Sequence, residues 1–245
     1  MASEKGFISK LGMLYAYLFK DFDYSAGSTE SADYEAYWQE PSQAGRGVKP
    51  KYVSLAGLLE PNATVLDIGC GDGTLLRYLT ETKNIQGKGI DVSERALALA
   101  REKGIEVYQG DLTDDSFAID GSYDYILMID VLEHLPNPEK VLVKTKGRFR
   151  RAVLLLLPNT GFIVDRLRLL FGRFPRQWEY WPWEHLRFWT VKDFLFWSRS
   201  LGFRVKRCYG TPLAPAQFFK LWKYWPSLFA RYVIYELVEG GRNSK

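Results

Sequence analysis

A glycine-rich turn holds the residues whose types and spacing say most about chemistry in this sequence. Three glycines stand at alternate positions after a short apolar run, and an acid comes two residues before the first of them. The residues of this turn are Asp67, Gly69, Cys70, Gly71, Asp72 and Gly73. An order of strand, glycine turn and helix lets the backbone approach a ligand closely and aims helix N–H groups at negative charge. Nucleotide-type ligands are held in this way at the carboxyl ends of parallel strands.

The acid and the glycine spacing distinguish between nucleotide ligands. A dinucleotide-binding turn has the pattern G-x-G-x-x-G, and its third glycine would fall at Thr74. A carboxylate at Asp67 would repel a pyrophosphate but attract a cationic amine or sulfonium. The turn resembles the S-adenosylmethionine (SAM) loop, D-x-G-x-G-x-G, of class I methyltransferases. A glycine-rich turn in some other α/β protein is the alternative.

Acids at the ends of the next two expected strands extend this cofactor site. Asp91 lies 18 residues past Gly73, where an acid can accept both ribose hydroxyls, although it could also cap the helix that follows. Val92 next to it joins the expected cofactor contacts. The resemblance implies that Asp111 holds the adenine amino group and that Leu112 packs on the ring, since a carboxylate suits an amine donor.

The fourth expected strand, 123–129, ends in a group of ionisable residues. Asp130, Glu133 and His134 have i, i+3, i+4 spacing, which would place them on one face of a helix starting there. The resemblance places Asp130 where cofactor and acceptor meet. His185, the only other histidine, precedes the sixth expected strand by one helix, so both imidazoles should approach the carboxyl edge of the sheet.

Three roles remain open for this group. Glu133 and His134 could brace the helix. His134 or His185, with Glu133, could act as the general base for a hydroxyl acceptor. Alternatively, Asp130, Glu133, His134 and His185 could hold a divalent metal, as in related methyltransferases with an E-x-x-E-H pattern, although the first acid here is Asp. Because SAM is already electrophilic, the lack of a nucleophile triad does not argue against an enzyme.

Composition bounds the protein class. The chain has 245 residues, fits one α/β domain with additions, and is 47% hydrophobic, which is ample for a core. A net charge of +4 is too small to indicate a nucleic-acid partner. Two cysteines give neither a disulfide framework nor a zinc pattern, so a cytoplasmic location is expected. The apolar run near the amino end is too short to span a membrane, and no cleavage site follows it.

Strands and helices alternate along most of the chain, which predicts an α/β fold. The resemblance implies a Rossmann-like class I methyltransferase fold: a seven-stranded, mostly parallel sheet with the last strand antiparallel, and helices on both faces. We expect residues 51–245 to form this domain, with an aromatic-rich lid inserted at about 160–186. Residues 1–50 would form a cap helix and a flap, whose aromatic cluster at 34–38 either closes over the cofactor or simply packs.

Several features are also similar to the group around the methionine-biosynthesis protein MetW. They are the basic run 144–151 with no Pro-Gly-Gly turn, the Pro-Asn pair after the fifth strand, and the basic stretch 165–175. The first functional hypothesis is SAM-dependent methylation of a small molecule, at oxygen rather than elsewhere. The second is a MetW-like accessory protein that acts through a partner acyltransferase of methionine biosynthesis. The third is a methyltransferase that contacts a membrane surface and acts on a lipid or quinone, suggested by residues 1–22 and the Trp-rich carboxyl-terminal stretch 216–225.

Overall fold

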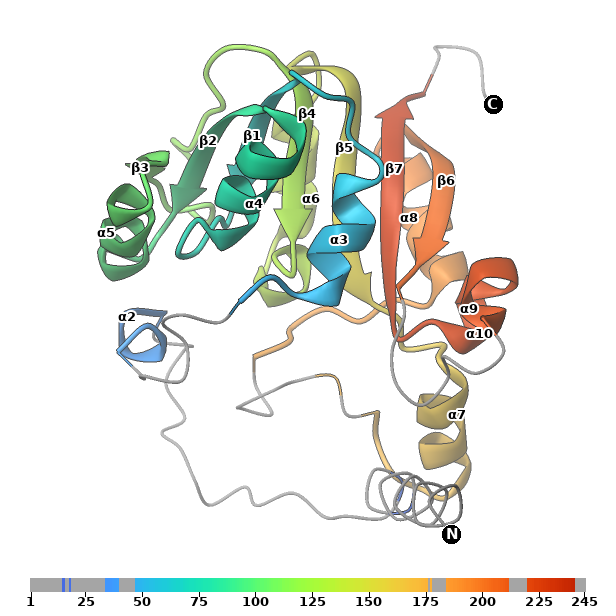
Figure 1. Ribbon diagram of the computed structural model, residues 1–245. Coiled ribbons are helices and arrows are strands. Elements are labelled where there is room, and N and C mark those ends of the chain that lie inside the picture. Colours follow the sequence, from blue (N-terminus) through green and yellow to red (C-terminus); the bar gives the residue numbers. More distant parts are fainter. Residues whose placement is uncertain are drawn as a thin grey trace, which may run out of the picture.

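The computed structural model describes residues 15, 18, 34–39, 47–175, 177, 184–211 and 220–240. Within them lies one seven-stranded sheet with the order β3-β2-β1-β4-β5-β7-β6 (Figure 1). The strands are β1 Thr64–Ile68, β2 Gln86–Asp91, β3 Glu106–Gln109, β4 Tyr123–Ile129, β5 Phe149–Pro158, β6 Phe203–Gly210 and β7 Tyr232–Glu239. The pairs among β1 to β5 are parallel, whereas β7 runs antiparallel to β5 and β6. The predicted fold class is therefore confirmed.

Helices cover both faces of this sheet. The helices of the described residues are α2 Tyr34–Tyr37, α3 Pro50–Ala56, α4 Thr74–Lys83, α5 Glu94–Glu102, η1 Leu132–His134, α6 Pro138–Lys144, α7 Ile163–Leu170, α8 Val191–Ser200, α9 Leu221–Tyr224 and α10 Pro226–Phe229. Apolar residues of α3, α4 and α5 belong to one core cluster, and those of α6 and α8 belong to the other. Figure 1 accordingly shows α3 and α4 in front of the sheet and α6 and α8 behind it.

The central strands explain why the sheet is stable. β4 and β5 are buried along most of their length, because both of their faces are covered by helices. Continuous apolar runs are typical of such parallel strands. The carboxyl ends of β1, β2 and β4 meet at one edge of the sheet, and α2 lies beyond that edge (Figure 1). The candidate site residues that end these strands are thereby brought together.

Two local expectations need correction. The end of the basic run 144–151, which was expected to precede the fifth strand at Ala152, belongs to that strand, since β5 begins at Phe149 and includes Arg150 and Arg151. The Arg150 Nε donates to Asp124 Oδ1 at 3.0 Å, and Arg151 pairs with Glu60, so solvated ion pairs replace apolar contacts at this end. Directly after β4 the chain forms the short 3-10 turn η1 rather than a helix starting at Asp130, and α6 follows from Pro138.

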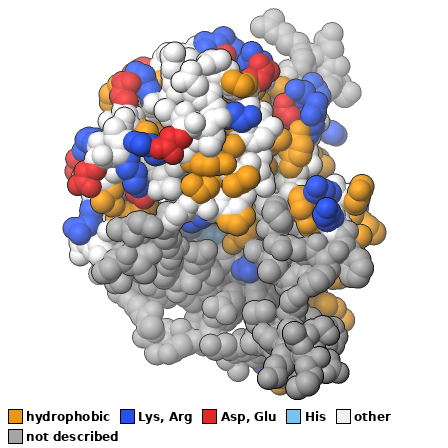
Figure 2. Space-filling model, viewed as in Figure 1, with side chains coloured by type: hydrophobic (Ala, Val, Ile, Leu, Met, Phe, Trp, Pro, Cys, Tyr) orange, Lys and Arg blue, Asp and Glu red, His pale blue; other side chains and the backbone are white. Residues whose placement is uncertain are grey.

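Several expected segments lie outside the described residues. They are residues 1–22 apart from Tyr15 and Leu18, residues 23–33 and 40–46 of the flap, the aromatic run 178–183, and residues 216–219 of the carboxyl-terminal stretch. In the described part of the chain no helix combines the length and the apolar character needed to cross a membrane. On the described part of the face in Figure 2, basic and acidic side chains are interspersed. Exposed ion pairs in the described residues include Arg77–Glu81 and Arg101–Glu94.

Candidate active site

The three glycines of the turn after β1 have left-handed backbone conformations. Their φ angles are 77°, 53° and 71° for Gly69, Gly71 and Gly73, a region that favours glycine. Neighbouring side chains also leave no room for a Cβ at two of these positions. A Cβ at Gly69 would lie 2.5 Å from Val131 Cγ2, and a Cβ at Gly71 would lie 2.7 Å from Trp38 Cζ2. The turn therefore needs glycine both for its shape and for close packing, as a backbone cradle for a ligand requires.

The two side chains between these glycines hold the turn in place. Asp72 Oδ1 accepts from Thr74 N at 3.1 Å, its Oδ2 accepts from Thr74 Oγ1 at 2.8 Å, and its carboxylate pairs with Lys103. Cys70 is buried, and its Sγ lies 2.5 Å from where a Cβ of Gly89 would be. Asp72 thus secures the start of α4, and Cys70 packs toward β2. Their direct contacts with a cofactor stay predictions.

Asp91 connects the glycine turn to the end of β2. Its Oδ2 accepts from Gly71 N at 2.8 Å and its Oδ1 accepts from Ser93 N at 3.0 Å. Burial raises the pKa of Asp91, while these backbone N–H bonds oppose the shift. Ser93 is the N-cap of α5, since its side chain accepts from Ala96 N at 3.2 Å. Each Asp91 oxygen keeps a further lone pair, which the predicted ribose contacts would use.

Asp67 supplies the test of whether this turn suits a sulfonium cofactor. The residue is 2% exposed, and within the described part of the chain its Oδ1 has no hydrogen-bond partner. Burial, and then the charge of Asp91, raise the pKa of Asp67 to about 8. A buried carboxyl group with an unused acceptor beside the glycine turn fits a cationic ligand, because a nearby positive charge would stabilise the ionised carboxylate.

The residues predicted for the adenine end lie on the outer side of the same edge. Asp111 is exposed, and its Oδ1 accepts from both the N and the Oγ1 of Thr113 at 2.7 Å. Leu112 is half-buried against the core, and Val92 is exposed while its carbonyl accepts from Gln109 Nε2 at 3.1 Å. Asp111 therefore shapes its own turn, and its contact with adenine stays a prediction.

Helix α2 and the residue after it join the glycine turn to His134. The Trp38 ring packs on Gly71, and its carbonyl accepts from Arg95 Nε at 3.1 Å. At the other end, the Tyr34 ring stands edge-on to the His134 ring, with centroids 6.4 Å apart. Because Tyr34 and Trp38 are separated by about one helical turn, the cofactor cradle and His134 are near neighbours across this segment.

Asp130 ends β4 in a left-handed conformation, with φ 57°. Its N donates to Leu156 O at 3.1 Å, and its carboxylate pairs with Lys51 from α3, leaving Oδ1 without a partner among the described residues. Burial alone would lower the pKa of Lys51, but the Asp130 carboxylate reverses this and raises it. Lys51 was missing from the predicted site. In the sequence it is only a basic residue at the start of an apolar helix, which does not indicate a contact with Asp130.

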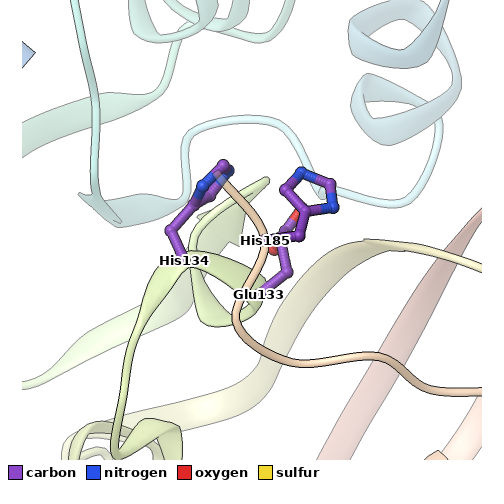
Figure 3. Close-up of side chains that lie close together, drawn as sticks. All are labelled: Glu133, His134 and His185. Atoms are coloured by element: carbon purple, nitrogen blue, oxygen red, sulfur yellow. The ribbon is translucent and has the colours of Figure 1, made fainter. Parts of the chain in front are cut away.

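Glu133, His134 and His185 form a compact cluster at this edge (Figure 3). One potential ligand atom from each residue lies within 4.8 Å of the others. The two imidazole rings are perpendicular, with centroids 4.7 Å apart. Asp130 contributes no ligand atom to this cluster, and its carboxylate pairs with Lys51 instead. The shared helical face required a helix starting at Asp130, and no such helix forms. The two imidazoles do lie together at this edge of the sheet, as expected.

Backbone bonds hold the two halves of this cluster together. Glu133 O accepts from Leu186 N at 2.7 Å and from Arg187 N at 3.1 Å. His134 Nδ1 donates to Glu184 O at 2.8 Å; the proton is assigned to Nδ1 because a carbonyl can only accept. Residues 184–187 are thereby tied to η1, which is why His185 reaches the site from 51 positions away in sequence.

Burial sets the charge state of the cluster. It lowers the pKa of His134 and, with the charge of His134, lowers that of His185 to about 3. It raises the pKa of Glu133 well above the usual range, helped by Asp130. Both imidazoles are thus neutral at physiological pH and can offer a lone pair to a proton or a cation.

The arginines after β5 have mainly structural partners where they are described. Arg168 is buried and donates to Phe174 O and Leu18 O, each at 3.0 Å. Arg166 Nε donates to Gly161 O at 2.7 Å. These guanidinium groups brace the backbone around α7.

Sheet order, glycine turn and the acid after β2 define a class I SAM-dependent methyltransferase. The solved methyltransferase in complex with the Trm112 methyltransferase activator of Haloferax volcanii is similar in fold: TM-score 0.63, 17% identity, covering 87% of this chain and 100% of that chain. Magnesium protoporphyrin IX methyltransferase from Synechocystis PCC 6803, solved with bound S-adenosylhomocysteine (SAH), gives a TM-score of 0.53 at 18% identity, covering 96% and 95%.

Sequence comparison identifies the family. The profile described as "Methionine biosynthesis protein MetW" matches residues 49–237, so the chain belongs to the MetW family. It is also similar to the "Ubiquinone biosynthesis O-methyltransferase" of Pseudomonas putida (strain W619), with 31% identity over 186 residues, covering 66% of this chain and 72% of that protein. The superfamily and subgroup resemblances predicted from sequence are both confirmed.

Proposed function

We propose that this protein transfers the methyl group of SAM to a hydroxyl oxygen of a small aromatic molecule. The observation that carries the proposal is the position of the Glu133, His134 and His185 cluster. His134 of this cluster lies against Tyr34 at one end of α2, and Trp38, about one helical turn further along, packs on the cradle at Gly71. An acceptor oxygen between them would face the cofactor on one side and proton-accepting or cation-holding groups on the other.

The reaction balances with groups that this site provides. The acceptor oxygen forms a bond to the methyl carbon as the C–S bond breaks, and that electron pair returns to sulfur to give SAH. The hydroxyl proton must leave, which is why a base or a cation near the oxygen accelerates transfer. The remaining work is binding and alignment, which falls to the glycine turn, Asp67 and Asp91 in this proposal.

Aromatic side chains around the cluster favour a flat acceptor. The Tyr34 ring lies against His134, and the Phe188 ring lies 6.5 Å from the His185 ring and contacts Phe174. Rings packed in this way suit an aromatic substrate. The name of the Pseudomonas putida relative, which modifies an oxygen in ubiquinone biosynthesis, supports a phenol or catechol.

The proposal is tested in two stages. Calorimetric titration of the intact protein with SAH should show micromolar binding, which Asp91→Ala should weaken by about tenfold or more because both backbone anchors and the ribose contacts are lost. A panel of phenols and catechols is then incubated with methyl-tritiated SAM. Enzyme-dependent O-methyl products are expected. Binding without transfer to any hydroxylated acceptor would contradict the proposal.

The family match favours a second function. A MetW-family protein could act as an accessory to an acyltransferase of methionine biosynthesis, with SAM bound as in the enzyme. SAH binding is common to both functions and does not separate them. Stable co-purification with an acyltransferase, together with no methyl turnover, would favour the accessory role.

A further inference from the structure

We propose that Glu133, His134 and His185 form a binding site for a divalent first-row transition-metal cation. The proposal deepens the function above and rests on it only for the role of the cation in methyl transfer. Cation binding itself follows from the geometry of the three side chains and is measured without SAM or acceptor.

The first observation is a set of donor atoms that lack partners. Glu133 is 1% exposed, and in the described part of the chain neither of its carboxylate oxygens accepts a hydrogen bond. His185 is also buried, and its Nδ1 has no hydrogen-bond partner among the described residues. A buried carboxyl group with no partner is costly. Because it stands within 4.8 Å of ligand atoms of both histidines, a shared cation would satisfy all three residues at once.

The second observation is the hydrogen bond that orients His134. Its Nδ1–H donates to Glu184 O at 2.8 Å, so the proton is placed on Nδ1 and the lone pair on Nε2. Imidazoles that bind metals commonly donate their other N–H to a backbone carbonyl or a carboxylate in this way. Glu184 directly precedes His185, so one peptide segment both orients the first imidazole and delivers the second.

The third observation is the rigidity of the support. Glu133 O accepts from Leu186 N and Arg187 N, which fixes the segment that carries His185 against η1. A site that is bonded on both sides in this way loses little conformational freedom when it binds a ligand. Figure 3 shows Glu133 and His134 on the η1 turn with His185 arriving from the crossing segment, so two elements distant in sequence converge on one point.

The donor set indicates the kind of cation. Two imidazole nitrogens and one carboxylate suit Mn²⁺, Fe²⁺, Co²⁺ or Zn²⁺, whereas Ca²⁺ and Mg²⁺ prefer oxygen ligands. Three protein ligands leave coordination positions open, as catalytic sites require. A hydroxyl group of the acceptor could take one of them. A cation there would lower the pKa of that hydroxyl and so ease loss of its proton to solvent.

The chain offers a clean test, because His134 and His185 are its only histidines. Protein without an affinity tag is treated with a chelator, exchanged into metal-free buffer, and titrated with Co²⁺, Mn²⁺ and Zn²⁺ by calorimetry. The Co²⁺ complex is also followed by its visible absorption. We expect one cation per chain with a dissociation constant below about 100 µM. Glu133→Gln and His185→Asn should each weaken binding by about tenfold or more.

Controls separate loss of ligands from loss of folding. Glu102→Gln changes an exposed glutamate outside the cluster and should leave cation binding unchanged. SAH affinity and circular dichroism of each variant report the fold. If Glu133→Gln does not fold, His185→Asn carries the comparison, and thermal stabilisation of the intact protein by the cation is an independent measure.

The outcomes are distinguishable. No binding of any of the three cations to the folded intact protein, or equal binding by the intact protein and His185→Asn, would overturn the cation site. If methyl transfer nevertheless occurs, the proposed function stands without a metal. If the cation binds but no acceptor is methylated, the site stands and the proposed function fails.

Discussion

Lys51 in α3 and Asp130 at the end of β4 form an ion pair across 79 positions of sequence. The two side chains are only 17% and 30% exposed. Asp130 holds its left-handed conformation at the point where β4 opens into the Glu133 and His185 cluster. The pair therefore fixes the helix before the first strand to the edge of the sheet where cofactor and acceptor are expected to meet.

We predict that Lys51→Met lowers the free energy of unfolding by about 2 kcal/mol, because it keeps the apolar length of the side chain but leaves a part-buried carboxylate unpaired. Urea denaturation measures this change. The matched control is Lys140→Met, which removes an exposed pair with Asp115 and should leave the free energy of unfolding close to that of the unchanged protein, because solvent screens such a pair.

A double-mutant cycle with Asp130→Asn isolates the interaction, since asparagine tolerates the same backbone conformation. We expect a coupling of about 1 kcal/mol or more between the two sites. Strictly additive losses would mean that the pair contributes nothing beyond its separate side chains.

Gly71→Ala should weaken SAH binding by about tenfold or more, because the added Cβ meets the Trp38 ring and moves the turn. Gly104→Ala is the matched control. Gly104 also has a positive φ of 75°, but a Cβ there would meet nothing within 4 Å. It should cost about 1 kcal/mol of stability from backbone strain alone and leave the SAH affinity unchanged. Calorimetry gives the SAH affinity of both variants, and urea denaturation gives their free energy of unfolding. If Gly71→Ala and Gly104→Ala bound SAH equally well, the steric argument would be refuted.

The predictable part of this site is local in sequence. Asp67, the three glycines and Asp91 lie at the ends of adjacent strands, so strand order and spacing alone bring them together. The unexpected contacts join residues far apart in sequence or depend on one backbone angle. Lys51 with Asp130 and His134 with Glu184 are of the first kind. The left-handed backbone of Asp130 is of the second kind, because no periodicity in the sequence signals it.

The buried Asp67 should make stability depend on pH. Its folded pKa of about 8 exceeds the unfolded value of about 3.9, so the folded state holds the proton more tightly between these values. The stabilisation is complete below about pH 4 and is lost as pH rises toward 8, by up to about 1.4 kcal/mol per pH unit. Asp67→Asn removes this contribution. The free energy of unfolding of the cofactor-free protein is therefore measured at a series of pH values from about 5 to about 8, where Asp67 would lose its proton. It should fall less with rising pH in the variant than in the unchanged protein. The same pH dependence in both would contradict the assignment.

Asp111 offers a test of cofactor orientation by base specificity. If its carboxylate accepts from the adenine amino group, the intact protein should bind SAH about tenfold or more tightly than S-inosylhomocysteine, whose base carries an acceptor at that position. Asp111→Asn keeps an oxygen for the Thr113 bonds and adds an amide donor that suits inosine. In this variant the ratio of the affinity for SAH to that for S-inosylhomocysteine should fall by about fivefold or more. Asp115→Asn, at an exposed neighbour, should leave the preference unchanged. Paired calorimetric titrations give the ratio, and an identical preference in Asp111→Asn would place the adenine elsewhere.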